Sequence, residues 1–460
     1  MLKIVHVTAT ATGAPWMVAL MREQQRLGHD VAAIIPALDG GIGAQLAALG
    51  IPCYAARVDV LFALSVVGKV VALSRLVRLL RRLRPDVVHS HIINSVVTAR
   101  LASWIADVPV HVGANAHPMS MESDVLRAIE VGTAFCDTVT MPSCSYTREL
   151  MLRHGIPARQ IELVHYAVDQ SGHDPSLADG ARARETLGIG AATPVVGKIA
   201  YFYPPARSAG LVPSRIEGRG IKGHEVLIRA VPRVLESVPD ATFILVGRGW
   251  GPAGAAYEQE LKELAASAGA GRAIRFIGER RDIPDLLAAF DVTVQCSLSD
   301  NLGGTVEALL MARPLVVSDI PGFADTVVHE MTGLVVPADD PAALADALVR
   351  LLRDRALARR LGEQGRRHVL ERFTLEKSVE GVERVLEARR RTATGRYRTG
   401  VSMARAAALP FRLLPVLLAV YRALRRHGFS AVRFVGQRLV HTMWRGVALV
   451  RKPRVSAGPT

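Results

Sequence analysis

The stretch Asp300-Asn301-Leu302-Gly303-Gly304-Thr305-Val306-Glu307 decides how the second half of this chain folds. It follows a short apolar run at 292–295, and its two glycines open a helix whose bare N–H groups can hold a phosphate. Glu307 lies one turn inside that helix, where its carboxylate can accept hydrogen bonds from ribose hydroxyls. Read singly, Asp300 could be an ordinary helix cap and Glu307 a surface acid. Together around a Gly-Gly turn, they favour a ligand site.

Working outward, the same alternation of short β-rich runs and helical patterns fills most of the sequence, as in parallel sheets covered by helices. The strands predicted in the first half are 3–7, 31–35, 86–89, 110–113 and 138–141. Those predicted in the second half are 195–199, 243–246, 274–277, 292–295, 315–318 and 334–336. The fold class is therefore α/β, with two Rossmann-like domains and a cleft between them.

Length and composition indicate two domains joined by a linker. The 460 residues exceed one ordinary core, and half of them are apolar, so two cores can be buried. A Gly-, Ala-, Asp- and Ser-rich stretch suggests a linker between the domains. We expect an N-terminal domain at 1–170, a linker at 171–193, a C-terminal domain at 194–375, a helix at 376–400 and a basic tail at 401–460.

The four cysteines have no paired spacing that would indicate disulfides or a zinc site. The first residues run directly into a strand pattern and lack the features of a secretory signal. These observations predict a protein of the cytoplasm.

Two further segments follow strands at the edge where doubly wound sheets bind ligands. The first contains Gly13, in a turn that lacks the full dinucleotide fingerprint, so NAD binding is disfavoured. The second places Lys222 beside a helix start, with Lys198 at the end of the preceding strand. Both lysines could neutralise a diphosphate that the helix dipole also favours; the alternative is two solvated surface lysines. Between them lies a long Pro-, Gly- and Arg-containing loop at 201–220, and loops of that length are usually lids or disordered.

The ordered set of segments resembles glycosyltransferase family 4, whose members are retaining enzymes of the GT-B fold. The matching pieces are RPDVVHSH at 84–91, ANAHP at 114–118, IKGHEVLIRA at 221–230, ATFILVGRG at 241–249, DNLGGTVEALLMARP at 300–314 and HEMTGLVVPADDP at 329–341. Together they span about residues 1 to 375.

The resemblance implies roles for individual residues. Lys198 and Lys222 would hold the diphosphate of a UDP- or GDP-sugar, and Glu307 would bind the ribose. Gly303, Gly304 and Thr305 would touch phosphate or sugar through their amides, and Gly13 would contact the acceptor. His117 would line the sugar pocket. Relatives usually have a glutamate where Ser299 stands, so the catalytic acid is assigned to Asp300, next in the sequence. No metal or other cofactor is expected, because lysines can stabilise the departing diphosphate. His89 and His91, at the end of a strand, are interpreted as structural.

The net charge of +15 is concentrated at the C-terminus. After Glu387 there are sixteen Lys and Arg and no Asp or Glu, so the rest of the chain is close to neutral. Residues 432–445 keep the spacing of a basic amphipathic helix, which would lie at an anionic membrane surface, and no run in the tail is long enough to span a bilayer. A second basic stretch without acids, 60–85, is either a solvated helix face or another membrane contact. Nucleic-acid binding is disfavoured, because the tail has few aromatics and no recognition motif.

These observations predict a retaining glycosyltransferase, peripheral at the inner face of the cell membrane, that moves a sugar to a lipid-linked or glycan acceptor of cell-surface polysaccharide or glycolipid synthesis. Two alternatives stay open. A nucleotide-sugar epimerase of the same fold would turn over its donor without an acceptor, and a catalytically silent membrane scaffold would not turn it over at all.

Overall fold

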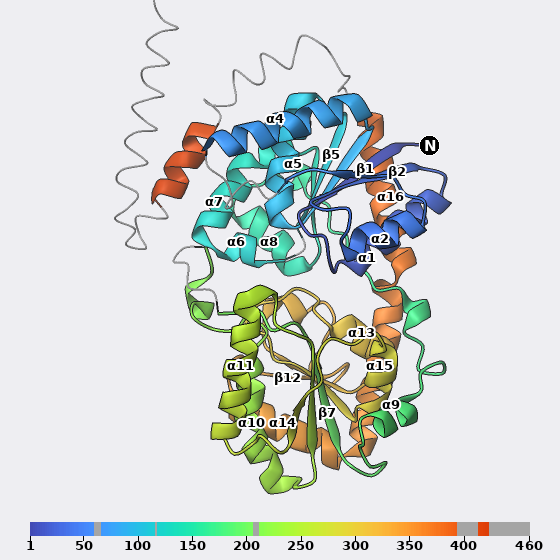
Figure 1. The fold of residues 1–460 in the computed structure, drawn as a ribbon, viewed down its shortest axis with the longest axis vertical. Helices are drawn as coiled ribbons and strands as arrows, with labels where there is room; N and C mark the ends of the chain where they lie inside the picture. The colour runs from blue at the N-terminus through green and yellow to red at the C-terminus, as the bar shows by residue number, and fades with distance from the viewer. Residues whose placement is uncertain (59–65, 116, 206–210, 393–412, 423–460) are drawn as a thin grey trace, which may run out of the picture.

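The computed structural model describes residues 1–58, 66–115, 117–205, 211–392 and 413–422, and these form two lobes, each built on a parallel six-stranded sheet (Figure 1). The N-terminal sheet has the strand order β3-β2-β1-β4-β5-β6, and the C-terminal sheet has the order β12-β11-β10-β7-β8-β9. In both, the first strand of the lobe is central and the strand order reverses beside it, which is the doubly wound topology. The predicted fold class of two Rossmann-like domains is confirmed.

The strands of the N-terminal lobe are β1 (Lys3–Thr8), β2 (Asp30–Ile35), β3 (Cys53–Ala55), β4 (Val87–His91), β5 (Val110–Asn115) and β6 (Val139–Pro142). Those of the C-terminal lobe are β7 (Val195–Ile199), β8 (Thr242–Val246), β9 (Ile274–Phe276), β10 (Val292–Gln295), β11 (Leu315–Ser318) and β12 (Leu334–Val336). Each predicted strand forms, and β3 is an addition. Most of these strands are buried along their whole length because helices cover both sheet faces.

The helices of the N-terminal lobe are α1 (Pro15–Arg26), α2 (Gly41–Ala48), α4 (Val66–Leu83), α5 (Ile93–Ala106), α6 (Met119–Glu122), α7 (Asp124–Thr133) and α8 (Ser145–Arg153). Those of the C-terminal lobe are α10 (His224–Ser237), α11 (Gly251–Ser267), α12 (Ile283–Ala289), α13 (Thr305–Leu310), α14 (Pro341–Arg353) and α15 (Arg355–Arg372).

The two lobes are joined by two segments of the chain. The stretch expected to be a linker contains α9 (Gly180–Thr186), in which a Cβ on Gly180 would touch the backbone of Ala288 in α12. After α15, the chain returns and α16 (Leu375–Thr392) packs on the N-terminal lobe. Its residues Leu375, Val379, Val382, Val385 and Leu386 share a core with Ile4 of β1 and Val110 of β5. Helix α16 therefore completes the N-terminal core.

Part of the basic tail is described. Residues 413–422 form a helix on the N-terminal lobe, where Val416 is buried against Gly132 of α7. The predicted amphipathic pattern at 432–445 lies outside the described residues. Among the described helices, none combines the length and the apolar character needed to cross a bilayer.

Candidate active site

A cavity of about 690 Å³ lies in the cleft between the lobes, a size typical of small-molecule sites. The N-terminal lobe lines it with the turn after β1, from Gly13 to Trp16, and with Tyr166. The C-terminal lobe lines it with residues at the ends of β7 and β10 and with Gly303, Gly304 and Glu307. Segments that lie far apart in the sequence therefore meet at the carboxyl ends of the strands, where a doubly wound sheet binds its ligand.

The Gly303-Gly304 turn requires both of its glycines. Gly303 has a φ of +51°, and a Cβ there would lie 3.1 Å from the Asp300 Oδ2 atom. A Cβ on Gly304 would lie 2.6 Å from the amide nitrogen of Gln295. The turn thus brings the backbone close to the cavity while leaving room for Asp300 and Gln295.

Glu307 lines the cavity from the first turn of α13. Its Oε2 atom is buried and has no hydrogen-bond partner in the part of the chain that the structure describes. Burial raises the pKa of this carboxyl group above its ordinary value. A buried acceptor without a partner is costly, by about 1–3 kcal/mol, so it is suited to accept hydrogen bonds from a ligand's hydroxyls.

Lys222 and Asp300 form a buried ion pair next to this cavity. The Lys222 Nζ atom lies 2.5 Å from Asp300 Oδ2, which also accepts a hydrogen bond of 3.0 Å from Ser297 Oγ. Burial alone would raise the pKa of Asp300, but Lys222 and then His117 lower it below its ordinary value. Burial likewise opposes the charge of Lys222, but Asp300 raises its pKa. Both groups are therefore charged at neutral pH.

His117 reaches the same carboxylate from the opposite lobe. The backbone N–H of Met119 donates to His117 Nδ1 at 3.1 Å, which leaves the ring proton on Nε2. That Nε2 atom lies 4.0 Å from Asp300 Oδ1. The two residues predicted to be catalytic, from separate domains, are thus neighbours.

Lys198 lies on β7 with its side chain buried, beside Cys296 and near Lys222 and Asp300. Its Nζ atom has no hydrogen-bond partner among the described residues. Burial lowers the pKa of this ammonium group. A buried ammonium group without a partner in the part of the protein that the structure describes favours a negatively charged ligand nearby.

Thr305 is occupied by local contacts. Its backbone N–H donates to the carbonyl oxygen of Leu302 at 3.2 Å, and its hydroxyl lies 2.9 Å from that of Thr326. These bonds show that Thr305 stabilises the turn that contains Gly303 and Gly304. Its predicted contact with the donor stays a prediction, as do those of the other site residues.

Polar contacts that the sequence analysis did not identify connect the two lobes across the cleft. Tyr166 donates through its hydroxyl to Asn301 Oδ1 at 3.1 Å, and Asn301 Nδ2 donates to Ser143 Oγ at 3.2 Å. In addition, Cys144 of the N-terminal lobe is part of a core cluster of the C-terminal lobe. These contacts join the two lobes across the cleft.

Glu122, at the end of α6, is another site residue that the sequence analysis did not identify. Its side chain is only 5% exposed and accepts hydrogen bonds from Arg215 at 2.7 Å, Ser299 at 3.0 Å and Tyr146 at 3.2 Å. Arg215 belongs to the long loop at 201–220, and Ser299 adjoins Asp300. One buried carboxylate of the N-terminal lobe thus fixes two segments of the C-terminal lobe. Local sequence carries no signal of this contact, because Arg215 and Ser299 lie 93 and 177 positions from Glu122.

Two doubly wound lobes with a cleft between them, lined by a glycine turn and flanked by cationic and acidic groups, define a protein of the GT-B class. Two family models match the chain, one in each lobe: "Glycosyl transferase 4-like domain" at residues 12–167 and "Glycosyl transferases group 1" at residues 210–354. The chain belongs to the group 1, family 4-like glycosyltransferases.

Similar proteins include the lipopolysaccharide core biosynthesis mannosyltransferase LpsB of Rhizobium meliloti (strain 1021), 32% identical over 170 residues, which are 36% of this chain and 48% of that protein. The UDP-Gal:alpha-D-GlcNAc-diphosphoundecaprenol alpha-1,3-galactosyltransferase of Escherichia coli is 23% identical over 331 residues, which are 69% of this chain and 79% of that protein. The chain thus spans about half the length of the first of these relatives. The crystal structure of Anabaena Alr3699/HepE in complex with UDP and glucose has a TM-score of 0.71 at 19% identity, covering 84% of this chain and 100% of that one. That likeness shows the fold.

We predict that Arg215→Ala loosens the loop at 201–220, because it removes the ion pair that ties this loop to Glu122. The side chain of Arg215 is 46% exposed, so the pair contributes at most about 1 kcal/mol. Amide hydrogen exchange at 211–220 should become about two- to fivefold faster. The control is Arg248→Ala, in which a similarly exposed arginine (54%) loses its pair with Glu279 inside one lobe. Equal acceleration by both variants, or none by Arg215→Ala, would contradict a role of this pair across the cleft.

Proposed function

We propose that this protein is a retaining glycosyltransferase that moves a sugar from a UDP- or GDP-sugar to a lipid-linked or glycan acceptor in cell-surface polysaccharide or glycolipid synthesis. The observation that carries the proposal is the pair of unsatisfied groups at the cleft. Glu307 offers a buried carboxylate oxygen without a partner, and Lys198 offers a buried ammonium group without one, among the described residues. A nucleotide sugar has both complements, ribose hydroxyls and a diphosphate.

The chemistry follows from where charge develops. As the bond from the sugar to the diphosphate breaks, negative charge grows on the leaving phosphate. Lys222, which pairs with Asp300 beside the Gly303 turn of the cavity, and the buried Lys198 near it can stabilise that charge. These cations are the reason that we propose catalysis without a bound metal. The acceptor hydroxyl then attacks the face that the diphosphate leaves and gives its proton to the departing phosphate. His117 and Asp300 orient the sugar, and Gly13 borders the acceptor.

A lipid-linked acceptor is supported by the names of relatives. The Escherichia coli relative is named for a diphosphoundecaprenol-linked acceptor, and the Rhizobium relative for the lipopolysaccharide core. By extension, we propose that the protein acts at the cytoplasmic face of a membrane.

The N-terminal lobe has a surface suited to that membrane. The buried face of α4 includes Leu76, Leu80 and Leu83, as its periodicity predicts. Its other face exposes Val67 and Val70, with relative exposures of 73% and 60%, next to Arg75, Arg78 and Arg82. Leu414, Leu417 and Leu418 of the helix at 413–422 are exposed on the same lobe. Exposed aliphatic residues beside cations without acids fit an anionic lipid surface, where each cation contributes about 1 kcal/mol.

The function is tested by calorimetry and turnover with UDP- and GDP-sugars, comparing the wild type with Glu307→Ala. We expect one nucleotide class to bind, and the variant to bind it about 10- to 100-fold more weakly, because two hydrogen bonds to a carboxylate are lost. Turnover should require an added lipid-linked acceptor, give a product of retained anomeric configuration and withstand a metal chelator. Turnover without an acceptor would indicate the epimerase, and binding of no donor would favour the scaffold.

The membrane surface is tested separately by co-sedimentation with vesicles that contain phosphatidylglycerol or only phosphatidylcholine. We expect the wild type to bind the anionic vesicles, and the double variant Val67→Asp/Val70→Asp to bind them several-fold more weakly, since it places charge where the apolar contact forms. Val328→Asp is the matched control, because Val328 is an exposed valine (39%) of the other lobe. Equal binding by the double variant and the control would overturn the assignment of this surface.

A further inference from the structure

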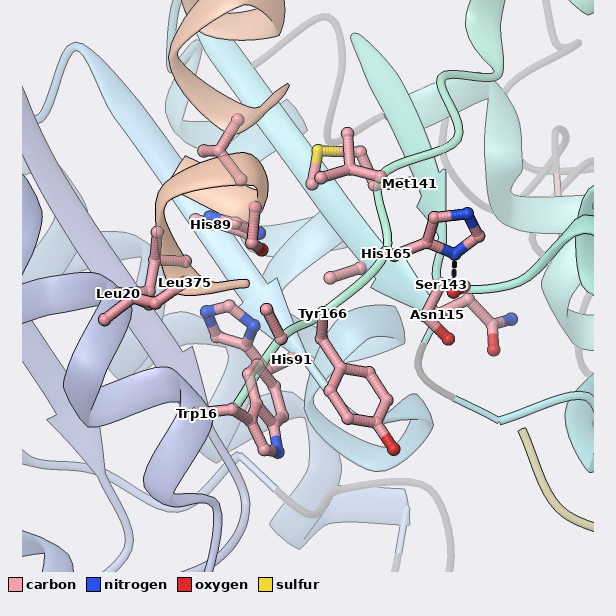
Figure 2. A pocket seen from close by; sticks show the side chains of 15 residues that line it. Trp16, Leu20, His89, His91, Asn115, Met141, Ser143, His165, Tyr166 and Leu375 are labelled. Atoms are coloured by element: carbon pink, nitrogen blue, oxygen red, sulfur yellow. Dashed lines mark hydrogen bonds between the residues drawn. The ribbon is translucent and has the colours of Figure 1, made fainter. Parts of the chain in front are cut away.

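Three histidines meet inside the N-terminal lobe, beneath α1 and α16 and apart from the donor-binding groups. His6 lies on β1, and His89 and His91 lie on β4, with His6 and His89 directly paired in the sheet. Their ring centroids are 4.2 to 5.2 Å apart, and each side chain is at most 1% exposed. Figure 2 shows His89 and His91 projecting from the same strand, with Trp16 packed against His91.

The nitrogens of this histidine cluster are only partly satisfied. His6 Nε2 lies 2.8 Å from Gln24 Oε1, and His6 Nδ1 lies 2.9 Å from His91 Nε2. By contrast, both nitrogens of His89 and the Nδ1 atom of His91 have no partner in the described part of the chain. Each such buried group costs about 1–3 kcal/mol. Groups of this kind ordinarily have an ion or a water as their partner.

We propose that His6, His89 and His91 bind a transition-metal ion of the zinc class. One nitrogen from each ring can be chosen so that all three lie within 4.8 Å of one another. Two nitrogens that share a tetrahedral zinc ion at about 2.0–2.1 Å lie roughly 3.3 Å apart. The His6 Nδ1 and His91 Nε2 atoms, 2.9 Å apart, would have to move slightly apart to reach that distance. A nitrogen of His89 would have to move toward them, from within 4.8 Å.

Gln24 prepares His6 for this role. Because its amide oxygen accepts the Nε2–H of His6, the Nδ1 atom that faces His91 carries a lone pair. The Gln24 amide in turn donates to Glu383 Oε1 at 2.9 Å, and Glu383 Oε2 lies 2.9 Å from His29. Metal-binding histidines almost always donate their second N–H to such a fixed acceptor, which sets the ring orientation.

The surroundings select the class of metal. The three ligand atoms are nitrogens, which suit zinc, copper, nickel or cobalt, whereas calcium and magnesium prefer oxygen. A cavity of about 40 Å³ borders His89 and His91, beneath Trp16, and is large enough for a water as the fourth ligand.

The test uses the full-length protein, stripped with a chelator and titrated with Zn²⁺ or Co²⁺. We expect one ion per chain, the visible absorption of tetrahedral Co²⁺, and a higher Tm with Zn²⁺, because a metal that binds only the folded state stabilises it. His89→Gln should abolish this stoichiometric binding. Gln24→Leu should weaken it about 10- to 100-fold, as expected when the partner of a ligand histidine is lost.

The matched control is His224→Gln, because His224 is also buried and without partners among the described residues but lies in the other lobe. Its metal binding should equal that of the wild type. No stoichiometric binding by the wild type, or a Co²⁺ spectrum of an octahedral ion, would overturn the proposal and leave water as the occupant. Unchanged binding by a folded His89→Gln variant would equally overturn it. The wild-type spectrum decides the question even if a variant does not fold. Neither result depends on donor turnover.

Discussion

The buried carboxylate of Asp300 is the constraint on which the site depends. A side chain that is 3% exposed can remain ionised only beside cations and hydrogen-bond donors, because burial of an unpaired charge is costly. Lys222 supplies the first partner from the same lobe, and His117 faces the second oxygen from the other lobe. Because Asp300 also touches the Gly303 turn, its placement links the charge cluster to the donor cavity. The same carboxylate therefore holds the charged groups of the site and connects the two lobes.

The contact between the two lobes also depends on residues that the N-terminal lobe contributes around α6 and just before α8. Glu122 accepts from Arg215 and Ser299, and Ser143 and Tyr166 hold Asn301. These bonds fix the residues on both sides of Asp300. The long loop at 201–220, an interruption in the sequence pattern, is therefore tied at Arg215 to the opposite lobe.

The features that could be predicted from the sequence are those set by residues close together in the chain. The strands and the Gly303-Gly304 turn were predictable because spacing within about ten residues determines them, and β3 was missed because three residues carry too little pattern. The Lys222 and Glu307 positions were predictable through the order of motifs. The Glu122–Arg215 pair joins residues 93 positions apart, and the histidine cluster joins His6 to His89 and His91. Nothing in local composition marks such partners before the sheet order is known.

The central claim, that groups from separate lobes act together on one donor, is tested most directly by a double-mutant cycle on kcat/KM. The four proteins are the wild type, His117→Ala, Asp300→Asn and the double variant. If the two residues act as a unit in the cleft, the double variant should lose about as much as the worse single variant, with a coupling above about 1 kcal/mol. Losses that simply add would contradict the account, because they would mean that His117 and Asp300 contribute independently.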